Sequence, residues 1–310
     1  MSRMVRRHRW RERVKAMNVL VLGGTRFMGK HLVDELLREG HAVTVGSTSR
    51  TEVRYDREPE KLRLDRENAG SMLEAVQGRS WDVVYDMIGY SPDDARLACE
   101  AFAGRTRRFV FISSLSVYEP AEKAQAETDW LPYGYPATGT DRSSLGYAEG
   151  KRQSEAVLAG AEGMETIFVR PPFVIGEDDY TRRLHWHVDR IANGLEIGLP
   201  APEARVQFIR SDEAGRFLGW LKTAPLSGPV NACSAGSIPL RELLELIGEA
   251  TGRTPRITAS VTDENASPYG VTGSWYMDHG KAEAAGYRFE RLMDWLPGFV
   301  GRLAASRPRD

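Results

Sequence analysis

Three side chains in the middle of the chain have the types and spacing that proton transfer at a carbon–oxygen bond requires. Tyr147 and Lys151 are four residues apart, so in a helix they share one face. A nearby ammonium lowers the pKa of a phenol, which would let the tyrosinate accept a proton near neutral pH. Ser114 could hydrogen-bond the oxygen of a reacting alcohol or carbonyl. This Tyr–Lys spacing is common by chance, so only the position of the pair in the fold can indicate whether it is catalytic.

A glycine-rich stretch near the N-terminus suits the binding of a phosphate. Residues 18–22 are apolar and mostly branched, and they run directly into Gly23, Gly24 and Gly29. Apolar residues then recur at helical spacing as far as Gly40, which predicts a strand, a tight turn and a helix. Backbone N–H groups at such a helix N-terminus favour a phosphate. Glycines also serve ordinary strand-to-helix turns, so the stretch alone leaves dinucleotide binding open.

The segments around these residues alternate between strands and helices. Further strands are predicted at 41–45, 62–65, 81–89, 109–112, 165–172, 206–209 and 229–232, and helices at 68–76, 92–103, 147–158, 182–193, 212–223 and 240–251. We therefore expect an α/β fold, a Rossmann-type doubly wound parallel sheet with a smaller C-terminal substrate lobe. Residues 17–175 and about 205–235 would form the dinucleotide-binding domain, and about 176–204 and 236–310 the lobe. Tyr147 then follows the fifth strand of a nucleotide-type sheet, which strengthens its catalytic interpretation.

The residues after the second predicted strand favour NADP over NAD. NAD-specific folds carry an acidic residue about 20 positions beyond the glycine turn, and residues 46–50 contain none. Ser47 and Arg50 suit a 2′-phosphate, and Arg26 in the glycine turn could clamp the same phosphate. Either arginine alone would favour a solvated surface side chain, and it is the pair together with the missing acid that favours NADP. Asp65, at the end of the third predicted strand, either contacts adenine or caps a helix.

Composition limits the partners and the compartment. The 310-residue chain has a net charge of −1, which argues against a nucleic-acid binder. Residues 1–16 contain seven basic side chains and one acid, and this extension is either a disordered, solvated segment or a polyanion-binding tail. Cys99 and Cys233 lie far apart, and His185 and His187 fall on different helix faces, so no metal site is expected. We expect a reducing cytoplasm and no membrane segment.

Five motifs, in this order, resemble the extended (atypical) short-chain dehydrogenase/reductase superfamily and its NAD(P)-dependent epimerase/dehydratase family. They are Gly-Gly-Thr-Arg-Phe-Met-Gly (23–29), Ser-Ser-Leu-Ser-Val-Tyr (113–118), Tyr-Ala-Glu-Gly-Lys (147–151), Val-Arg-Pro (169–171), and Met-Asp-His-Gly-Lys-Ala with a later Gly-Tyr (277–287). The resemblance runs from Met17 nearly to the C-terminus. It implies Tyr147 as the acid/base, Lys151 on the nicotinamide ribose and Ser114 as the partner of the substrate oxygen.

The candidate cofactor-binding residues follow from the motifs and from the predicted strand ends. They are Gly23, Thr25, Arg26, Phe27, Met28, Gly29, Ser47, Arg50, Asp65, Arg66, Ile88, Gly89, Tyr147, Lys151, Pro171 and Phe173.

Three departures from the family pattern qualify the expected reaction. Arg26 stands where the family has its middle glycine, a variant that resembles an atypical subgroup that includes chloroplast stem-loop RNA-binding proteins. Leu115 and Ser116 stand where the sugar dehydratases have an Asp-Glu pair, so dehydration is not expected. Phe173 replaces an Asn of many nucleotide-sugar epimerases, which puts a UDP- or dTDP-sugar in doubt. The arginines that could bind an anion instead are Arg182, Arg183, Arg210 and Arg216.

The resemblance implies an oxidoreductase or epimerase that uses NADP or NAD. Its expected substrate is a small secondary alcohol or ketone, with a sugar derivative or nucleotide sugar as the candidate, and a homodimer is the candidate assembly. The alternative is a non-catalytic NAD(P)-sensing or RNA-binding protein on the same fold, which Arg26 and the basic extension support.

Overall fold

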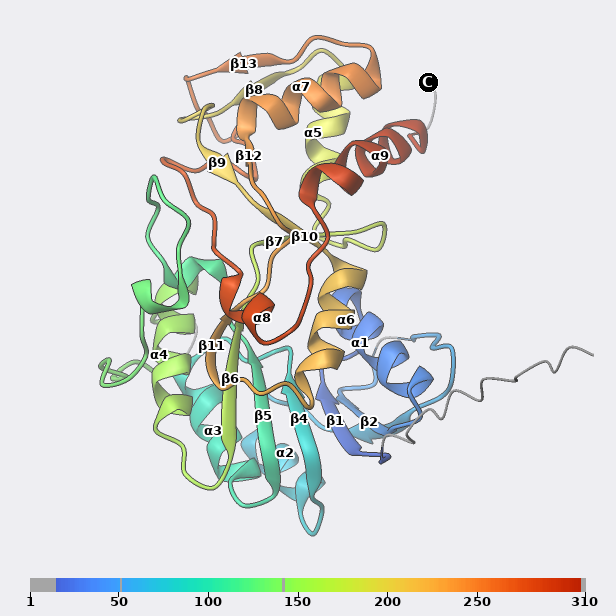
Figure 1. Ribbon diagram of the computed structural model, residues 1–310, viewed down its shortest axis with the longest axis vertical. Coiled ribbons are helices and arrows are strands. Elements are labelled where there is room, and N and C mark those ends of the chain that lie inside the picture. Colours follow the sequence, from blue (N-terminus) through green and yellow to red (C-terminus); the bar gives the residue numbers. More distant parts are fainter. Residues whose placement is uncertain (1–14, 51, 141–142, 308–310) are drawn as a thin grey trace, which may run out of the picture.

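The computed structural model describes residues 15–50, 52–140 and 143–307 of the chain. The predicted basic extension, residues 1–16, lies outside the described residues except for its last two. Figure 1 shows a sheet flanked by helices, with a second group of helices and short strands above it.

The predicted doubly wound parallel sheet is confirmed. Its strands are β1 (Asn18–Leu22), β2 (Ala42–Ser47), β3 (Glu60–Arg63), β4 (Trp81–Asp86), β5 (Thr106–Ile112), β6 (Glu165–Arg170) and β11 (Gly228–Asn231). They lie in the order β11-β6-β5-β4-β1-β2-β3, and every neighbouring pair is parallel. The strand order reverses between β1 and β4, so the carboxyl ends of these strands open a crevice, which is where such sheets bind ligands.

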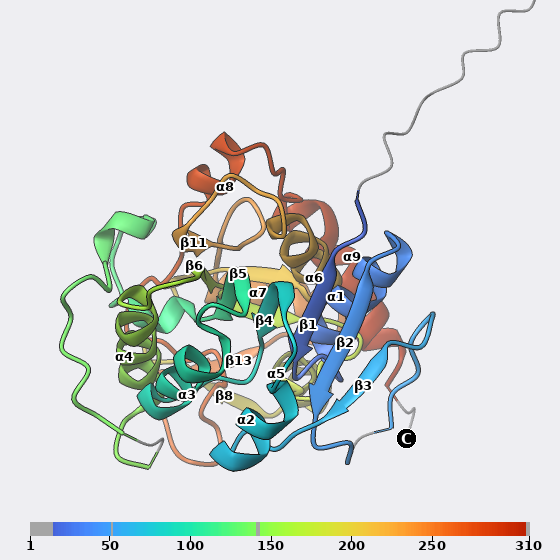
Figure 2. The same ribbon diagram turned by 90° about the horizontal axis from the view of Figure 1, so that it is seen from below.

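Helices cover both faces of this sheet because the strand residues alternate between two cores (Figure 2). Val19 and Val21 of β1 belong to the core shared with α1 (Phe27–Arg38) and α6 (Ser211–Leu221). Leu20 and Leu22 belong to the opposite core, with α2 (Ala69–Val76), α3 (Pro92–Phe102) and α4 (Tyr147–Ala159). Strands with both faces buried are apolar throughout, as residues 18–22 are.

A separate hydrophobic core holds the upper group of elements together. It contains residues of α5 (Arg183–Ala192), α7 (Leu240–Thr251) and α9 (Leu292–Ala305). The short strands there are β7 (Phe173–Ile175), β8 (Glu196–Gly198), β9 (Arg205–Val206), β10 (Phe208–Arg210), β12 (Ile238–Pro239) and β13 (Arg256–Thr258).

One segment lies apart from the predicted lobe. Helix α8 (Gly280–Ala284) packs beside β11, and Ala282 and Phe289 belong to the core of the sheet. The boundary that assigned residues 236–310 as a whole to the lobe is therefore wrong at this segment, because its apolar side chains are buried against the sheet.

Local sequence signals explain where several elements begin. Ser91 caps α3 by accepting from the Asp94 backbone N–H at 3.2 Å, and the Asp94 carboxylate accepts in return from the Ser91 N–H at 3.0 Å. Pro92, which has no N–H to satisfy, opens the helix. The third strand ends at Arg63, two residues earlier than predicted, and Asp65 lies in the turn beyond it, where its carboxylate accepts from the Glu67 N–H at 3.0 Å.

One histidine is part of the upper core. His187 is fully buried, its ring stacks on Tyr269 with centroids 4.8 Å apart, and its nitrogens lie 2.7 Å from the Arg183 carbonyl oxygen and 2.7 Å from Ser267 Oγ. Burial lowers its pKa to about 4. Within the described ranges, no cluster of three or more His, Cys, Asp or Glu side chains could hold a metal ion, and no helix has the length and apolarity to cross a membrane.

Candidate active site

The glycine turn brings three backbone segments into close contact. Gly23 has φ +80° and donates its N–H to the Gly46 carbonyl oxygen at 3.0 Å. A Cβ at Gly23 would lie 2.3 Å from Ile88 Cγ2, and a Cβ at Gly29 would lie 3.0 Å from the Gly23 carbonyl oxygen. Helix α1 starts directly after this turn, and the side chain of its N-cap residue makes no capping hydrogen bond. The packing of the turn therefore requires both glycines, and the first N–H groups of α1 are the groups that favour a phosphate.

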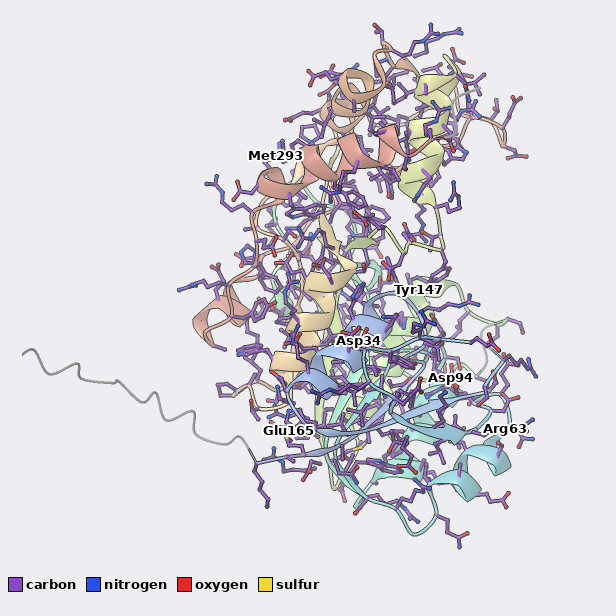
Figure 3. All side chains as sticks on the ribbon, turned by 90° about the vertical axis from the view of Figure 1, so that its right-hand side faces the viewer. Asp34, Arg63, Asp94, Tyr147, Glu165 and Met293 are labelled. Carbon is purple, nitrogen blue, oxygen red and sulfur yellow. The ribbon has the colours of Figure 1, made fainter. Side chains whose placement is uncertain are left out.

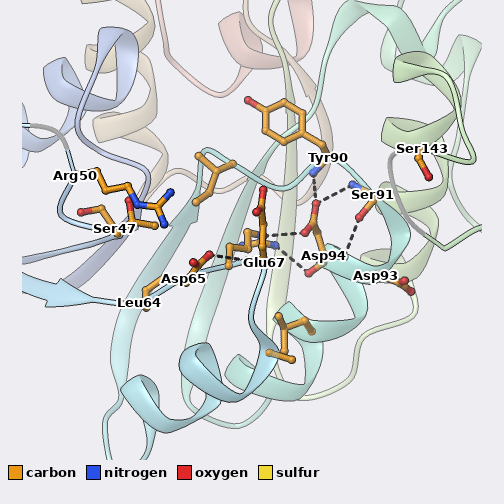
Figure 4. A pocket seen from close by; sticks show the side chains of 15 residues that line it. Ser47, Arg50, Leu64, Asp65, Glu67, Tyr90, Ser91, Asp93, Asp94 and Ser143 are labelled. Carbon is orange, nitrogen blue, oxygen red and sulfur yellow. Dashed lines mark hydrogen bonds and ion pairs between the residues drawn. The ribbon is translucent and has the colours of Figure 1, made fainter.

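A pocket of about 660 Å³ lies at the carboxyl ends of β2, β3 and β4 (Figure 4). Five of the predicted cofactor residues line it together, namely Ser47, Arg50, Asp65, Arg66 and Ile88. Its walls combine hydroxyls, one exposed arginine and several carboxylates, a set that can hydrogen-bond an adenosine with its ribose.

The Arg66 guanidinium joins two elements of this pocket. It is buried, and its Nη2 lies 2.7 Å from the Asp86 carboxylate and donates to the Asp94 carbonyl oxygen at 2.9 Å. Asp94 in turn accepts from the Tyr90 and Ser91 N–H groups at 2.8 and 3.0 Å, as Figure 4 shows. Arg66 thus fixes the end of β4 against α3. This side chain, predicted as a cofactor-binding residue, therefore has a structural role in the wall of the pocket.

The structure does not bring Arg26 and Arg50 together around one pocket. Arg50 lines the pocket beside Ser47, whereas the Arg26 guanidinium lies over the Tyr180 ring, 5.9 Å from its centroid. Tyr180 follows β7 and belongs to the predicted lobe. The expectation that both arginines clamp one phosphate is therefore wrong in its geometry, because an aromatic contact directs Arg26 toward the lobe.

The second pocket, of about 340 Å³, contains the predicted catalytic residues. Ser114, Tyr147 and Lys151 line it together with four other predicted residues, Phe27, Met28, Pro171 and Phe173. Tyr147 is the first residue of α4, so its ring projects from the helix N-terminus, and Figure 3 shows it where the sheet meets the upper elements. Ser114, just past β5, hydrogen-bonds the Tyr147 hydroxyl through its side chain.

The two pockets meet at one residue that the sequence analysis did not single out. Tyr90 lines both, and its ring centroid lies 4.4 Å from Lys151 Nζ and 6.3 Å from the ring centroid of Tyr147. A dinucleotide with its diphosphate on the glycine turn would reach from one pocket into the other. The only sequence signal for Tyr90 was its place after a strand that ends near a glycine.

Lys151 is held by the backbone. Its side chain is buried, and Nζ donates to the carbonyl oxygens of Gly89 and Ile112 at 2.7 and 2.6 Å. It therefore sits between the ends of β4 and β5, close to the catalytic pocket. Gly89, another predicted cofactor residue, contributes through this carbonyl.

The pKa of Tyr147 is raised. Just over half of its side chain is exposed (55%), so the ring edge faces the pocket. Burial of the hydroxyl raises the pKa, while the hydrogen bond from Ser114 and the positive charge of Arg183 oppose that shift. The lowered pKa expected from the Tyr–Lys spacing is therefore wrong, because burial of the hydroxyl outweighs the groups that lower the pKa. The Lys151 ammonium lies 5.8 Å from the Tyr147 ring centroid and donates to two carbonyl oxygens.

Among the four arginines suggested as anion ligands, Arg183 lines the catalytic pocket. Arg182 lines a different pocket, between α5 and α9. Arg210 and Arg216 are both paired with Asp212 and Glu290. The catalytic pocket also contains two buried hydroxyls, of Ser113 and Ser116, whose oxygens have no hydrogen-bond partner among the described residues.

A buried ion pair fixes the long connection between β5 and α4. Arg170, at the end of β6, and Glu155 of α4 are both fully buried, and the guanidinium binds the carboxylate through two bonds of 3.0 and 2.6 Å. Arg170 also donates to the Tyr118 hydroxyl at 2.7 Å and to the Trp130 carbonyl oxygen at 3.1 Å. Arg170 of the Val-Arg-Pro motif thus holds the connection between β5 and α4 in place. Pro171, the next residue, lines the catalytic pocket.

The chain is similar to known proteins. A model of the NAD dependent epimerase/dehydratase family matches residues 19–231. A chloroplast stem-loop binding protein of 41 kDa (form b) from Arabidopsis thaliana is 25% identical over 259 residues, which cover 73% of this chain and 65% of that protein.

Solved structures share the fold. The UDP-glucose 4-epimerase of Thermus thermophilus in complex with NAD matches with a TM-score of 0.72 and 19% identity, over 93% of this chain and 99% of that one. The UDP-glucose 4-epimerase of Thermotoga maritima with UDP-glucose matches with a TM-score of 0.69 and 18% identity, over 92% and 97%.

Proposed function

Because the chain belongs to the NAD dependent epimerase/dehydratase family, we propose that it transfers a hydride between a secondary alcohol or ketone and an NAD(P) cofactor. The family predicted from the motifs is confirmed. The observation that carries the proposal is the presence of Ser114, Tyr147 and Lys151 in one pocket with the glycine-turn residues Phe27 and Met28.

The two connected pockets and the glycine turn fit a dinucleotide. The N–H groups at the start of α1 would bind the diphosphate, Ser47, Arg50 and Asp65 would hold the adenosine, and Lys151 would hold the nicotinamide ribose. When bound, the nicotinamide supplies or accepts a hydride at its C4. We propose NADP as the preferred form, because a hydroxyl and an exposed guanidinium, those of Ser47 and Arg50, line this pocket together and suit a 2′-phosphate.

Tyr147 moves the proton. In the reductive direction its Oη protonates the carbonyl oxygen of the substrate, and in the oxidative direction it takes the proton of the alcohol. Its raised pKa keeps the phenol protonated at neutral pH, which is the form that reduction requires. Ser114 Oγ would hydrogen-bond the same oxygen and orient it toward Tyr147.

The proposed substrate is a sugar or nucleotide sugar, with Arg183 as the anion ligand in the catalytic pocket. Leu115 and Ser116 supply no carboxylic acid to protonate a leaving hydroxyl, so we propose oxidoreduction or epimerisation and not dehydration.

The first test measures binding of NADPH and NADH to the purified protein, and then oxidation or epimerisation of UDP-glucose, the probe substrate, in the presence of NADP⁺ or NAD⁺. We expect tighter binding of NADPH, and the replacement Tyr147→Phe should abolish hydride transfer while dinucleotide binding remains. Tyr133→Phe, at a similarly exposed tyrosine (60%), is the matched control and should keep full activity. Full activity in Tyr147→Phe would refute the role of the phenol. Tightly held NAD in the purified protein would favour an epimerase.

RNA binding is the second candidate function, and it is supported by the similarity to the stem-loop binding protein. It predicts salt-dependent binding of a stem-loop RNA that is lost on deletion of residues 1–16, because phosphate contacts release counterions. The same affinity with and without the basic extension would contradict this form of the proposal.

A further inference from the structure

One contact joins the glycine turn to a loop far along the chain. The Tyr180 ring lies edge-on to the Phe27 ring, with centroids 5.9 Å apart and an interplanar angle of 79°. The Arg26 guanidinium lies over the same Tyr180 ring at 5.9 Å. Tyr180 is 61% exposed, so it stands at the surface of the molecule and not in its core.

This contact joins two residues that line the catalytic pocket. Phe27 contributes one wall and Tyr180 another, and Tyr147 lies in the same pocket. Phe27 has φ +54°, a conformation that a bulky side chain rarely adopts. Its ring is nevertheless buried, in contact with Tyr180. The glycine turn and the loop therefore enclose the pocket from two sides.

The base of the loop is fastened to the same helix that the turn begins. Asp178 accepts a hydrogen bond from Ser211 Oγ at 2.7 Å, and its other oxygen lies 3.1 Å from Nε2 of His31 on α1. The tip at Tyr180 then reaches back to the first residues of that helix. A loop fixed at its base and in aromatic contact at its tip can open by releasing the tip alone.

We propose that Arg26 and Tyr180 form a clasp over the glycine turn, which must open for the dinucleotide to enter or leave. The proposal rests on the proposed function, since it assumes a dinucleotide on this turn. It gives Arg26 a positioning role in place of the phosphate clamp expected from its sequence position. Since the 2′-phosphate is proposed to bind at Arg50, which lines the other pocket, we expect the clasp to act equally on NADPH and NADH.

The experiment is a stopped-flow measurement of NADPH and NADH fluorescence, with release started by excess NADP. Arg26→Ala and Tyr180→Ala should each release both dinucleotides about two- to fivefold faster, the equivalent of ~0.5–1 kcal/mol for an exposed cation–π contact. The double variant should release no faster than the faster single variant, because both changes open the same clasp. Tyr180→Phe, which keeps the ring, and Arg241→Ala, on distant α7, should release at the wild-type rate.

Each contrary result identifies what fails. Unchanged release in both alanine variants overturns the clasp. Additive effects overturn it by showing that Arg26 and Tyr180 act independently. A change confined to NADPH in Arg26→Ala overturns it by showing that Arg26 contacts the 2′-phosphate. If the wild-type protein binds neither dinucleotide, the proposed function and the clasp are both wrong, whereas wild-type binding with unaffected variants refutes the clasp alone.

Discussion

The buried pair Arg170–Glu155 should respond sharply to the loss of one partner. Glu155→Gln removes the negative charge and leaves the guanidinium fully buried beside a neutral amide. Removing one member of such a pair costs about 3–5 kcal/mol of unfolding free energy, because the remaining charge is uncompensated. Arg170 keeps its bonds to the Tyr118 hydroxyl and the Trp130 carbonyl oxygen, which places the expected loss near the lower end, at about 3 kcal/mol.

The double variant Glu155→Leu with Arg170→Met tests that explanation. It buries no charge, so it avoids the desolvation cost. What it loses is the donor to Tyr118 and to Trp130, at about 1 kcal/mol for each bond. We therefore expect it to be about 1–2 kcal/mol less stable than the wild type, and more stable than either single variant.

Urea denaturation followed by tryptophan fluorescence measures these differences. Glu203→Gln, which breaks an exposed ion pair with Arg241, is the control and should leave the unfolding midpoint unchanged. The reasoning is refuted if Glu155→Gln costs less than about 1 kcal/mol, or if the double variant is less stable than both single variants.

Three further predictions follow from local geometry. Buried His187 has a pKa of about 4, so its contribution to stability is complete above pH 6.5 and falls by about 1.4 kcal/mol per pH unit as the pH drops toward 4. In His187→Phe the free energy of urea unfolding should therefore depend less on pH over this range. An unchanged pH dependence would contradict the assignment. Gly23→Ala should lower the free energy of unfolding by about 1–3 kcal/mol and weaken dinucleotide binding. The control Gly104→Ala has a similar φ of +70° but no neighbour within 4 Å of the new Cβ, so it should lose less stability. Equal losses in thermal or urea unfolding would show that the Ile88 side chain moves aside. In fluorescence titrations Arg50→Ala should raise the Kd for NADPH about tenfold and leave the Kd for NADH unchanged, since one charge-assisted hydrogen bond to the 2′-phosphate is lost. An equal rise of both Kd values would exclude a contact between Arg50 and the 2′-phosphate.

The elements that position the site were predictable because their signals are local. The apolar run 18–22 with its glycines specified strand β1, the turn and α1, and Ser91 with Pro92 specified the start of α3. The spacing of Tyr147 and Lys151 placed both on α4. Each of these signals involves residues within a few positions of one another, so the chain carries them whatever packs against it.

The orientations of charged side chains were not predictable, because their partners lie far along the sequence. Lys151 is directed to carbonyls at the ends of two other strands, and Arg26 to Tyr180 in a distant loop. In the same way α8 packs on the sheet because Ala282 is buried there, a contact that composition alone does not specify. Spacing predicts which residues share a helix face, but the pKa of Tyr147 depends on the side chains and the burial that surround that face in the fold.

The arrangement of the upper core has a consequence for synthesis on the ribosome. Helix α5 buries Leu184, Val188 and Ile191 against residues of α7 and α9, which are made much later. Until residue 303 has left the exit tunnel, these apolar side chains have no complete partner, although the sheet can close once β11 is available. The nascent chain therefore exposes the apolar face of α5 while all seven strands of the sheet are already available, and a chain truncated after β11 should be captured by chaperones through this helix.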